Sequence, residues 1–196
     1  MKRLFDIVAS SLGLIVLSPL FVVLAVWIKA DSEGPIFYRQ TRVGRNNKNF
    51  RLFKFRSMRP GSDRAGLITV GGRDPRVTRS GYYIRKYKLD EFPQLINVLK
   101  GDMSLVGPRP EVRKYVDMYT AKQKRVLSVR PGITSLASIR YRNENDILAA
   151  SEDPDRTYIE QVMPDKLAID LEYVEHAGLL TDIKLIFTTF REIITK

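Results

Sequence analysis

The sequence predicts a small α/β domain, mainly helical with a small β-hairpin or sheet, that an amino-terminal helix anchors to a membrane. Three features predict it. The stretch from Ile7 to Ile28 is uncharged and 22 residues long; at about 1.5 Å per residue, a helix of that length crosses a ~30 Å hydrocarbon core. Residues 36–38 and 50–55 have strand-like composition and flank a turn at 44–47. Apolar residues recur at helical spacing over residues 179–194.

The composition excludes several kinds of covalent, metal and catalytic chemistry. The chain has 196 residues, of which 33 are Lys or Arg and 22 are Asp or Glu, with one His and no Cys. Disulfides, thiolate metal sites and a cysteine nucleophile are therefore excluded, and acid–base chemistry falls mainly to carboxylates or Lys. Residues 1–139 hold 26 basic and 10 acidic residues, whereas residues 140–196 hold 7 and 12. A body this basic predicts an anionic partner: phosphates, nucleic acid or an acidic membrane face.

The apolar run ends as a membrane segment does. Trp27 and Lys29 lie at its end, and the polar residues 31–34 follow, as expected at a membrane–water interface. A cleavable signal peptide is the alternative, because Lys2 and Arg3 resemble its charged leading region. The run is too long for a signal peptide, and no small-residue cleavage site follows it.

Ser18 and Pro19 lie near the middle of this run and predict a break. Pro19 has no N–H and clashes with the carbonyl of Ile15. Cations flank both ends of the run, and a single span would place one cationic flank outside, against the positive-inside tendency. The sequence therefore favours a re-entrant membrane helix over residues 1–30, broken at Ser18–Pro19, with a cytosolic domain over residues 31–196. An ordinary kinked span is the alternative.

A basic stretch follows the membrane segment. Between Glu33 and Asp63 there are eight basic residues and no acidic one. Lys54 and Arg56, on the second predicted strand, are candidates to bind phosphate; a solvated face near anionic lipid is the alternative. Residues 61–72 are expected to form a glycine-rich loop. The chain contains neither a P-loop nor a G-x-G-x-x-G motif, so a phosphate site must be built another way.

The segment from Tyr82 to Pro110 contains the acids that can carry chemistry. Apolar residues before Gly101 predict a short helix with a glycine stop. Pro93 is tolerated only in a first turn, so this helix is expected to begin near Asp90 or Glu91. Both acids are then explained as caps of their own helix. Alternatively, two adjacent carboxylates beside a cationic site bind Mg²⁺ together with substrate phosphates, and a carboxylate can also be a nucleophile.

At this segment the sequence resembles a known family. Residues 89–110, LDEFPQLINVLKGDMSLVGPRP, are similar to the signature of the bacterial sugar transferases, the monotopic polyprenyl-phosphate phosphoglycosyl transferases of the small single-domain type. Further blocks resemble the family in order along the chain: the apolar run with Ser18–Pro19, GPIFYRQTRVG, FRLFKFRSM, DPRVTRSG, VRPGIT and the tail that begins DKLAIDLEYVEH. The likeness covers nearly the whole chain.

The resemblance implies an enzyme that transfers a sugar-1-phosphate from a UDP-sugar to polyprenyl (undecaprenyl) phosphate and releases UMP. It implies that Asp90 attacks the sugar-bearing phosphate to give a covalent phosphosugar intermediate. Glu91 is implied to bind Mg²⁺, with Asp90 beside it, and to activate the lipid phosphate. Arg85 and the turn Pro108–Arg109–Pro110 match positions implicated in phosphate binding; Arg suits forked contacts with phosphate oxygens.

The chain departs from the family pattern after Gly132. Ser135 replaces a glycine, and ASIRYRN (residues 137–143) stands where many members have A-Q-V-N-G-R. Arg142 keeps the family's arginine position and Arg130 lies in the VRPGIT block, so both are candidate substrate-binding residues. This region is expected to contact nucleotide or sugar, and the sugar is therefore left open. The acidic residues 144–165 are expected to be helical in pieces, with a break at Asp153–Pro154, and have no assigned role.

The remaining expectations concern location and partners. The resemblance places a catalytic domain, residues 31–196, on the cytosolic face of the bacterial inner membrane, in contact with lipid, and leaves the oligomeric state open. The last helix is expected to be amphipathic, either packed on the core or lying in the lipid interface. His176, the sole His, is expected at the surface without a catalytic role. Rival hypotheses are direct glycosyl transfer with release of UDP, nucleic-acid binding, which lacks any recognisable motif, and an inactive scaffold.

Overall fold

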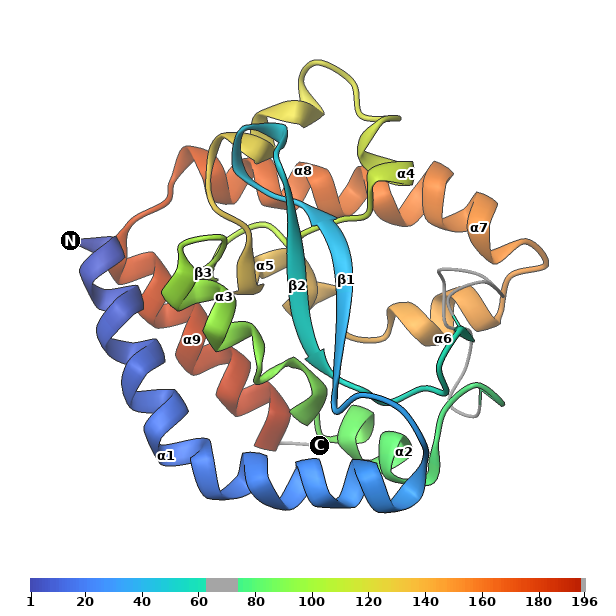
Figure 1. Ribbon diagram of the computed structural model, residues 1–196. Coiled ribbons are helices and arrows are strands. Elements are labelled where there is room, and N and C mark those ends of the chain that lie inside the picture. Colours follow the sequence, from blue (N-terminus) through green and yellow to red (C-terminus); the bar gives the residue numbers. More distant parts are fainter. Residues whose placement is uncertain (63–73, 195–196) are drawn as a thin grey trace.

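A computed structural model describes residues 1–62 and 74–194 and shows a mainly helical chain around two small sheets (Figure 1). The α-helices are α1 (Lys2–Asp31), α2 (Arg79–Lys86), α3 (Gln94–Lys100), α4 (Arg113–Val116), α5 (Leu136–Arg140), α6 (Glu144–Ala149), α7 (Pro154–Thr157), α8 (Met163–Glu175) and α9 (Leu179–Ile194). Tighter or wider helical turns are η1 (Arg45–Asn47), η3 (Leu89–Glu91), η4 (Gln123–Ser128) and η5 (Tyr158–Val162). The strands are β1 (Phe37–Val43), β2 (Asn49–Phe55), β3 (Ser104–Val106) and β4 (Gly132–Thr134). The predicted class, helical with small sheets, is confirmed; the loop expected over residues 61–72 lies almost wholly outside the described residues.

β1 and β2 form the predicted antiparallel hairpin, which crosses the middle of the molecule (Figure 1). Phe37 lies opposite Phe55 and Val43 opposite Asn49, so β1 is longer than the strand predicted over residues 36–38. In the turn, Asn46 and Asn47 have φ angles of 57° and 61°. Asn enters this left-handed region more readily than most residues because its short side chain bonds locally.

β3 and β4 form a second, parallel pair that the sequence did not predict. Ser104 lies opposite Gly132 and Val106 opposite Thr134, and strands of three residues are too short to show an alternating pattern. A Cβ on Gly132 would overlap the amide nitrogen of Gly107. The close approach of these two backbones therefore requires glycine.

α1 bends sharply but remains one helix from Lys2 to Asp31; its two arms run along the edge of the molecule (Figure 1). Pro19 lies inside the helix. The hydroxyl of Ser18 donates to the carbonyl of Ile15 at 2.7 Å, the acceptor that Pro19 leaves without its helical donor. A bend at proline, with a side chain replacing the lost hydrogen bond, therefore takes the place of the predicted break.

The first arm of α1 is fixed to the body of the protein by charged side chains. Arg3 donates to the carbonyl of Val98 at 2.5 Å, at the end of α3. Lys2 donates to the carbonyl of Val106 at 3.0 Å and forms an ion pair with buried Asp182 of α9. These two flanking cations therefore bind the protein itself.

The second arm packs through apolar side chains. Leu24 and Ile28 are buried in one cluster with Phe55 of β2 and Ile84 of α2. Burying side chains of this size stabilises the packing by about 1.5–3 kcal/mol each. Both ends of α1 are therefore held on the same body.

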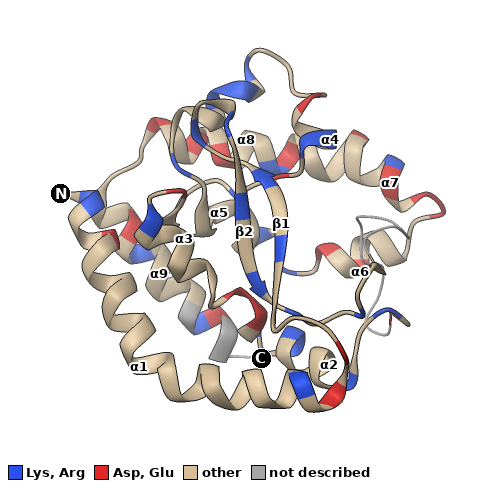
Figure 2. Ribbon diagram, in the orientation of Figure 1, with Lys and Arg blue, Asp and Glu red and all other residues tan. Residues whose placement is uncertain are grey.

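The outer face of α1 is apolar and exposed. It includes Leu12, Val16, Val22 and Val26, and Figure 2 shows charged residues on this helix mainly near its ends. Within the described part of the chain, α1 is the one helix long and apolar enough to cross a membrane. An apolar surface of this length would be unfavourable if it were exposed to water. Its presence therefore supports the predicted association of α1 with a membrane.

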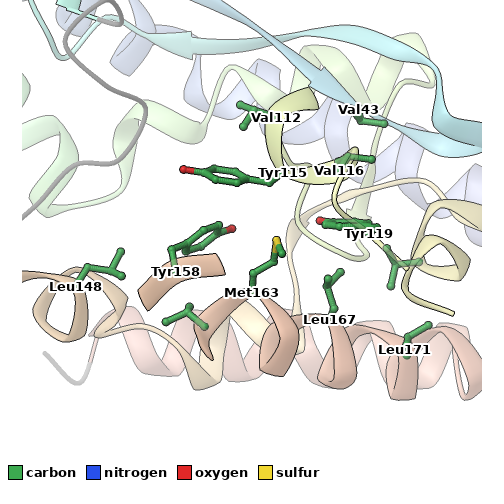
Figure 3. Close-up of a cluster of buried hydrophobic side chains, with 12 residues drawn as sticks. Val43, Val112, Tyr115, Val116, Tyr119, Leu148, Tyr158, Met163, Leu167 and Leu171 are labelled. Atoms are coloured by element: carbon green, nitrogen blue, oxygen red, sulfur yellow. The ribbon is translucent and has the colours of Figure 1, made fainter. Parts of the chain in front are cut away.

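The largest buried cluster packs α4 and the end of β1 against η5 and α8 (Figure 3). Tyr115 and Tyr158 lie against each other with ring centroids 4.8 Å apart, and Leu148 of α6 closes the cluster beside them. Leu148 and Tyr158 belong to the acidic segment 144–165, so part of that segment serves to pack the core. As predicted, that segment is helical in pieces, and Asp153 caps α7 where Pro154 begins it.

α9 forms where the apolar spacing predicted it. Asp182 and Leu185 are buried on the side that meets β3 and β4, whereas Leu180 is 84% exposed and Phe187 71% exposed. One face of α9 therefore packs on the core, and the other remains apolar and open.

Candidate active site

The two candidate acids lie in a turn of their own rather than at the start of α3. The predicted helix start near Asp90 is wrong, because α3 begins at Gln94 with Pro93 at its cap. Asp90 and Glu91 belong to η3, where the amide of Glu91 donates back to Lys88 at 3.4 Å in a tight, three-residue pattern. No cap contact from either acid to α3 occurs among the described residues. Helix capping therefore does not explain this acidic pair.

Lys88 fixes the direction of this turn. It adopts a left-handed conformation, with φ 56°, which is uncommon for a long side chain. Its side chain is exposed, and its carbonyl accepts the amide of Glu91. A strained residue held in place beside ionisable groups is typical of a functional site.

Asp90 is 6% exposed and faces a lysine from the hairpin. The Nζ of Lys54, near the end of β2, lies 3.6 Å from its Oδ2. The same Nζ lies 3.0 Å from Oε1 of Glu91. One ammonium thus serves both carboxylates, which reduces the repulsion between two adjacent negative charges.

Glu91 is bound more tightly than Asp90. Arg109 donates to both of its carboxylate oxygens, in the forked geometry that guanidinium groups favour. Burial alone would raise the pKa of Glu91, but the charges of Arg109 and Lys54 hold that pKa well below its usual range. In return, the charge of Glu91 raises the pKa of Arg109. Glu91 is therefore an anion at neutral pH.

Lys54, Asp90 and Arg109 border a cavity of about 450 Å³, a volume within the usual range of ligand sites. Its lining is strongly basic. Among the described residues, eight Lys or Arg line it, namely Arg42, Lys54, Arg56, Arg59, Arg76, Arg85, Arg109 and Lys166. Three acids of the described part of the chain also line it, namely Asp90, Glu111 and Glu144. The balance favours a ligand with several negative charges.

The structure brings together most of the residues that the sequence singled out. Lys54, Arg85, Asp90 and Arg109 line the cavity, and Glu91 contacts two of them. They come from β2, α2, η3 and the segment after β3. The residues are far apart in the chain, yet they meet at one end of the hairpin.

Arg56 lines the same cavity but has a different use. It is buried, and its guanidinium donates to the carbonyls of Ile28 at 3.1 Å and Ser32 at 2.6 Å, as well as to that of Glu33. These carbonyls lie at the carboxyl end of α1, where helices leave acceptors unsatisfied. Arg56 therefore links α1 to the hairpin, and these nitrogens are not free for phosphate.

The prolines around Arg109 shape its turn from the other side. Pro108 and Pro110 line a separate cavity of about 30 Å³ with Asp170 of α8. Burial raises the pKa of Asp170 to about 7, although the charge of Lys166 and the backbone amides of Arg109 and Ala137 favour its ionised form. Asp170 thus supports the backbone that presents Arg109.

Arg130 and Arg142 lie elsewhere, and neither is among the described residues that line the larger cavity. Arg130 donates to the carbonyl of Gly101 at 2.8 Å, at the end of α3. Arg142 forms an ion pair with Glu192 of α9. Both therefore hold helices in place.

A second group of polar residues at the cavity was not predicted from the sequence. Arg42 donates to Oε1 of Glu111 at 2.9 Å and to the carbonyl of Pro110 at 3.1 Å, and Tyr158 donates to Glu111 as well. The charged residues Lys166 and Glu144 pair at 2.6 Å. The run of basic residues included Arg42, but nothing in the sequence connected it to acids far along the chain.

The carboxylates fit a magnesium ion only if a substrate supplies further ligands. The described residues contain no group of three His, Cys, Asp or Glu side chains that could hold a metal ion. Asp90 and the ionised Glu91 provide two hard oxygen donors, and Mg²⁺ commonly uses one or two carboxylates plus substrate phosphates. The donor set therefore suits Mg²⁺ bound together with a diphosphate.

Comparisons with known proteins agree with the geometry. The family profile described as bacterial sugar transferase matches residues 1–196. The chain is 41% identical, over 99% of its length and 44% of the other protein, to the UDP-N-acetylgalactosamine-undecaprenyl-phosphate N-acetylgalactosaminephosphotransferase of Aeromonas hydrophila. It is 37% identical, over 100% of its length and 41% of the other, to the UDP-glucose:undecaprenyl-phosphate glucose-1-phosphate transferase of Escherichia coli (strain K12).

A shorter relative is also similar. The uncharacterized sugar transferase EpsL of Bacillus subtilis (strain 168) is 39% identical over 99% of this chain and 87% of its own length. The chain spans less than half the length of the two named transferases. The match nevertheless covers every segment described above, from the bent helix to α9, and the chain belongs to the bacterial sugar transferase family.

Proposed function

We propose that this protein transfers a sugar-1-phosphate from a UDP-sugar to undecaprenyl phosphate and releases UMP, as the first membrane step of glycan assembly. One observation carries the proposal: buried Asp90 lies 3.6 Å from Lys54 at a cavity that eight basic residues line within residues 1–62 and 74–194. The names of the relatives, which act on UDP-sugars and undecaprenyl phosphate, support the choice of donor and acceptor.

The chemistry proposed for Asp90 is nucleophilic. Its carboxylate oxygen attacks the phosphorus that bears the sugar, the bond from that phosphorus to the bridging oxygen breaks, and UMP leaves with the electron pair. An oxygen of undecaprenyl phosphate then attacks the same phosphorus and displaces Asp90, which returns as a carboxylate. Two in-line displacements split one difficult exchange between anions into two steps.

The basic residues stabilise the charge that these steps develop. Lys54 and Arg109 already neutralise the acidic pair, and Arg85 adds a third cation on the cavity wall. Mg²⁺ held by Asp90, Glu91 and the donor phosphates would supply further neutralisation of the leaving UMP. Fixed charges at such a site commonly contribute about 10²- to 10³-fold in rate for each donor.

We propose also that α1 is re-entrant and seats the domain on the cytosolic face of the inner membrane. The contacts of Arg3 and Lys2 at one end, and of Leu24 and Ile28 at the other, hold both ends of α1 on the same body. A straight span would carry its ends to opposite sides of a ~30 Å core. The bend at Pro19 and the exposed apolar face between the ends support entry and exit through one leaflet.

The test is donor turnover by detergent-solubilised protein with Mg²⁺, undecaprenyl phosphate and a panel of UDP-sugars. Release of UMP from at least one donor is expected, whereas release of UDP would indicate direct glycosyl transfer. Asp90→Asn should abolish both turnover and the phosphosugar adduct seen by intact-protein mass spectrometry. His176→Ala is the matched surface control, because His176 is exposed and its imidazole is hydrogen-bonded to the carbonyl of Glu172 in the preceding helix. Near-normal turnover by Asp90→Asn would refute the nucleophile.

A further inference from the structure

The cavity has a wall that the proposed chemistry leaves unused. Besides its cationic part, it is lined by Glu144, Asn145 and Leu148, all from α6, and by Tyr158. α6 begins the acidic segment to which the sequence assigned no role, and it directly follows residues 137–143, where the chain departs from its family. We propose that α6 recognises the sugar of the donor, with Glu144 as the residue that selects among sugars.

Glu144 lies within electrostatic reach of the reaction site. It is one of the charges that raise the pKa of Arg109, whose guanidinium holds Glu91. The sugar is attached to the phosphorus that Asp90 attacks, so it must lie beside Arg109 and the acidic pair. A residue that both lines the cavity and acts on Arg109 is placed to meet it. This inference rests on the proposed function.

The chemistry of this wall suits a sugar better than a nucleobase. Lys166 binds one oxygen of Glu144 at 2.6 Å and so fixes the carboxylate in position. The two oxygens of a carboxylate can accept hydrogen bonds from neighbouring hydroxyl groups of a pyranose, and Asn145 adds an amide donor and acceptor.

The aromatic residues on this wall cannot stack on a base. The rings of Tyr115 and Tyr158 are buried against each other (Figure 3), and their hydroxyl groups are bound to Asp155 and Glu111. Leu148 lies beside them and is itself buried, so it also offers no face to a ligand. The remaining polar groups of the wall therefore define the contact.

The position of α6 also fits a role in selection. The catalytic groups lie on β2, η3 and the turn around Arg109, whereas α6 contributes none of them. A change on α6 can therefore alter the choice of sugar without disturbing the nucleophile. Discrimination arises because a site built to hydrogen-bond a hydroxyl leaves its own polar groups unpaired when the hydroxyl is missing or inverted.

The experiment compares kcat/KM for UMP release with UDP-glucose, UDP-galactose, UDP-N-acetylglucosamine and UDP-N-acetylgalactosamine. Glu144→Ala is expected to change the ratio between the preferred donor and its C4 epimer by at least about tenfold, and Asn145→Ala by less. The inhibition constant of UMP, which has no sugar, is expected to stay within about twofold. Asp146→Asn, on the exposed side of the same helix, is the matched control and should change neither quantity.

The outcomes separate the two proposals. If the wild-type protein releases UMP but Glu144→Ala and Asn145→Ala keep its ranking of donors, α6 does not select the sugar and the inference alone fails. If UMP inhibits the variants more weakly and kcat/KM falls equally for all four donors, α6 contacts the nucleoside. That result would also overturn the inference. If the wild-type protein releases UMP from no donor, the proposed function fails and the inference fails with it. Since Asn145 is exposed, its variant tests the wall even if loss of the Lys166 partner unfolds Glu144→Ala.

Discussion

The ammonium nitrogen of Lys54 lies 3.6 Å from a carboxylate oxygen of Asp90. The lysine comes from a hairpin strand and the aspartate from a turn packed against it. Asp90 is therefore held close to this cation and does not cap α3. A nucleophilic carboxylate needs this arrangement, because it must approach a diphosphate that carries charge of the same sign.

Replacing Lys54 with Met tests this relationship. We expect kcat/KM for UMP release to fall by about 10²- to 10³-fold, because the ammonium that neutralises both carboxylates is lost. The pKa of Glu91, which Arg109 and Lys54 hold low, should rise, so the acidic limb of the pH–rate profile should move to higher pH. The measurement is the initial rate between about pH 3 and pH 9, so that the acidic limb set by Glu91 lies inside the window.

Arg51→Met is the matched control for this prediction. Arg51 lies on the same strand and its side chain is exposed, so its loss changes the net charge equally without touching the acids. An unchanged pH profile in Lys54→Met, together with a lowered rate, would mean that Lys54 acts on the substrate and not on Glu91.

Local features of this protein could be predicted from the sequence. The hairpin follows from strand-like segments on each side of Gly44, and α9 from apolar residues at helical spacing. The Ser18 hydroxyl bond to Ile15 follows from the missing N–H of Pro19. Each of these depends on residues that are neighbours in the chain.

The site could be predicted only through the resemblance to a family. Local spacing favoured Asp90 as a helix cap, and the structure places it in η3 instead. The pairing of Glu91 with Lys54 and Arg109 joins segments 37 and 18 residues apart, and no local pattern encodes such contacts. The bond between Arg42 and Glu111, across 69 residues, was missed for the same reason.

Asp170 gives the stability a pH dependence of its own. Its pKa is about 7 when folded, against 3.8 for an ordinary Asp, so between about pH 4 and pH 7 the folded state holds a proton that the unfolded state has lost. Stability from this group therefore falls as the pH rises through that window. In Asp170→Asn the fall should be absent, so the melting temperature of the variant minus that of the wild type should increase from pH 5 to pH 8.

Glu172→Gln, on the exposed side of α8, controls for the loss of one acid from the same helix. Its melting temperature should follow that of the wild type at every pH. A constant difference between Asp170→Asn and the wild type from pH 5 to pH 8 would mean that Asp170 is ionised in the folded protein throughout, stabilised by the charge of Lys166 and by the amides of Arg109 and Ala137.

Removal of divalent metal should stop turnover. The described residues contain no three-carboxylate cage. Mg²⁺ is therefore expected to bind weakly when no UDP-sugar is bound, and EDTA should remove it within minutes. Activity should return with Mg²⁺ but poorly with Ca²⁺, which prefers longer bonds and more ligands. EDTA saturated with Mg²⁺ is the control, and full turnover in excess free EDTA would show that Lys54, Arg85 and Arg109 suffice.

The path of α1 can be tested with single cysteines, because the chain contains none. A cysteine placed before Met1 and another in Lys29→Cys mark the two ends of the helix, and Lys122→Cys marks an exposed position on the domain. In inverted and right-side-out membrane vesicles, a membrane-impermeant maleimide should label all three from the cytosolic side alone, since Arg3 and Ile28 are held on the same body. Labelling of the first cysteine from the opposite side to Lys29→Cys would establish a single span. The contacts of Lys2 with Val106 and Asp182 would then have to break in the membrane, and the bend at Pro19 would be only a kink.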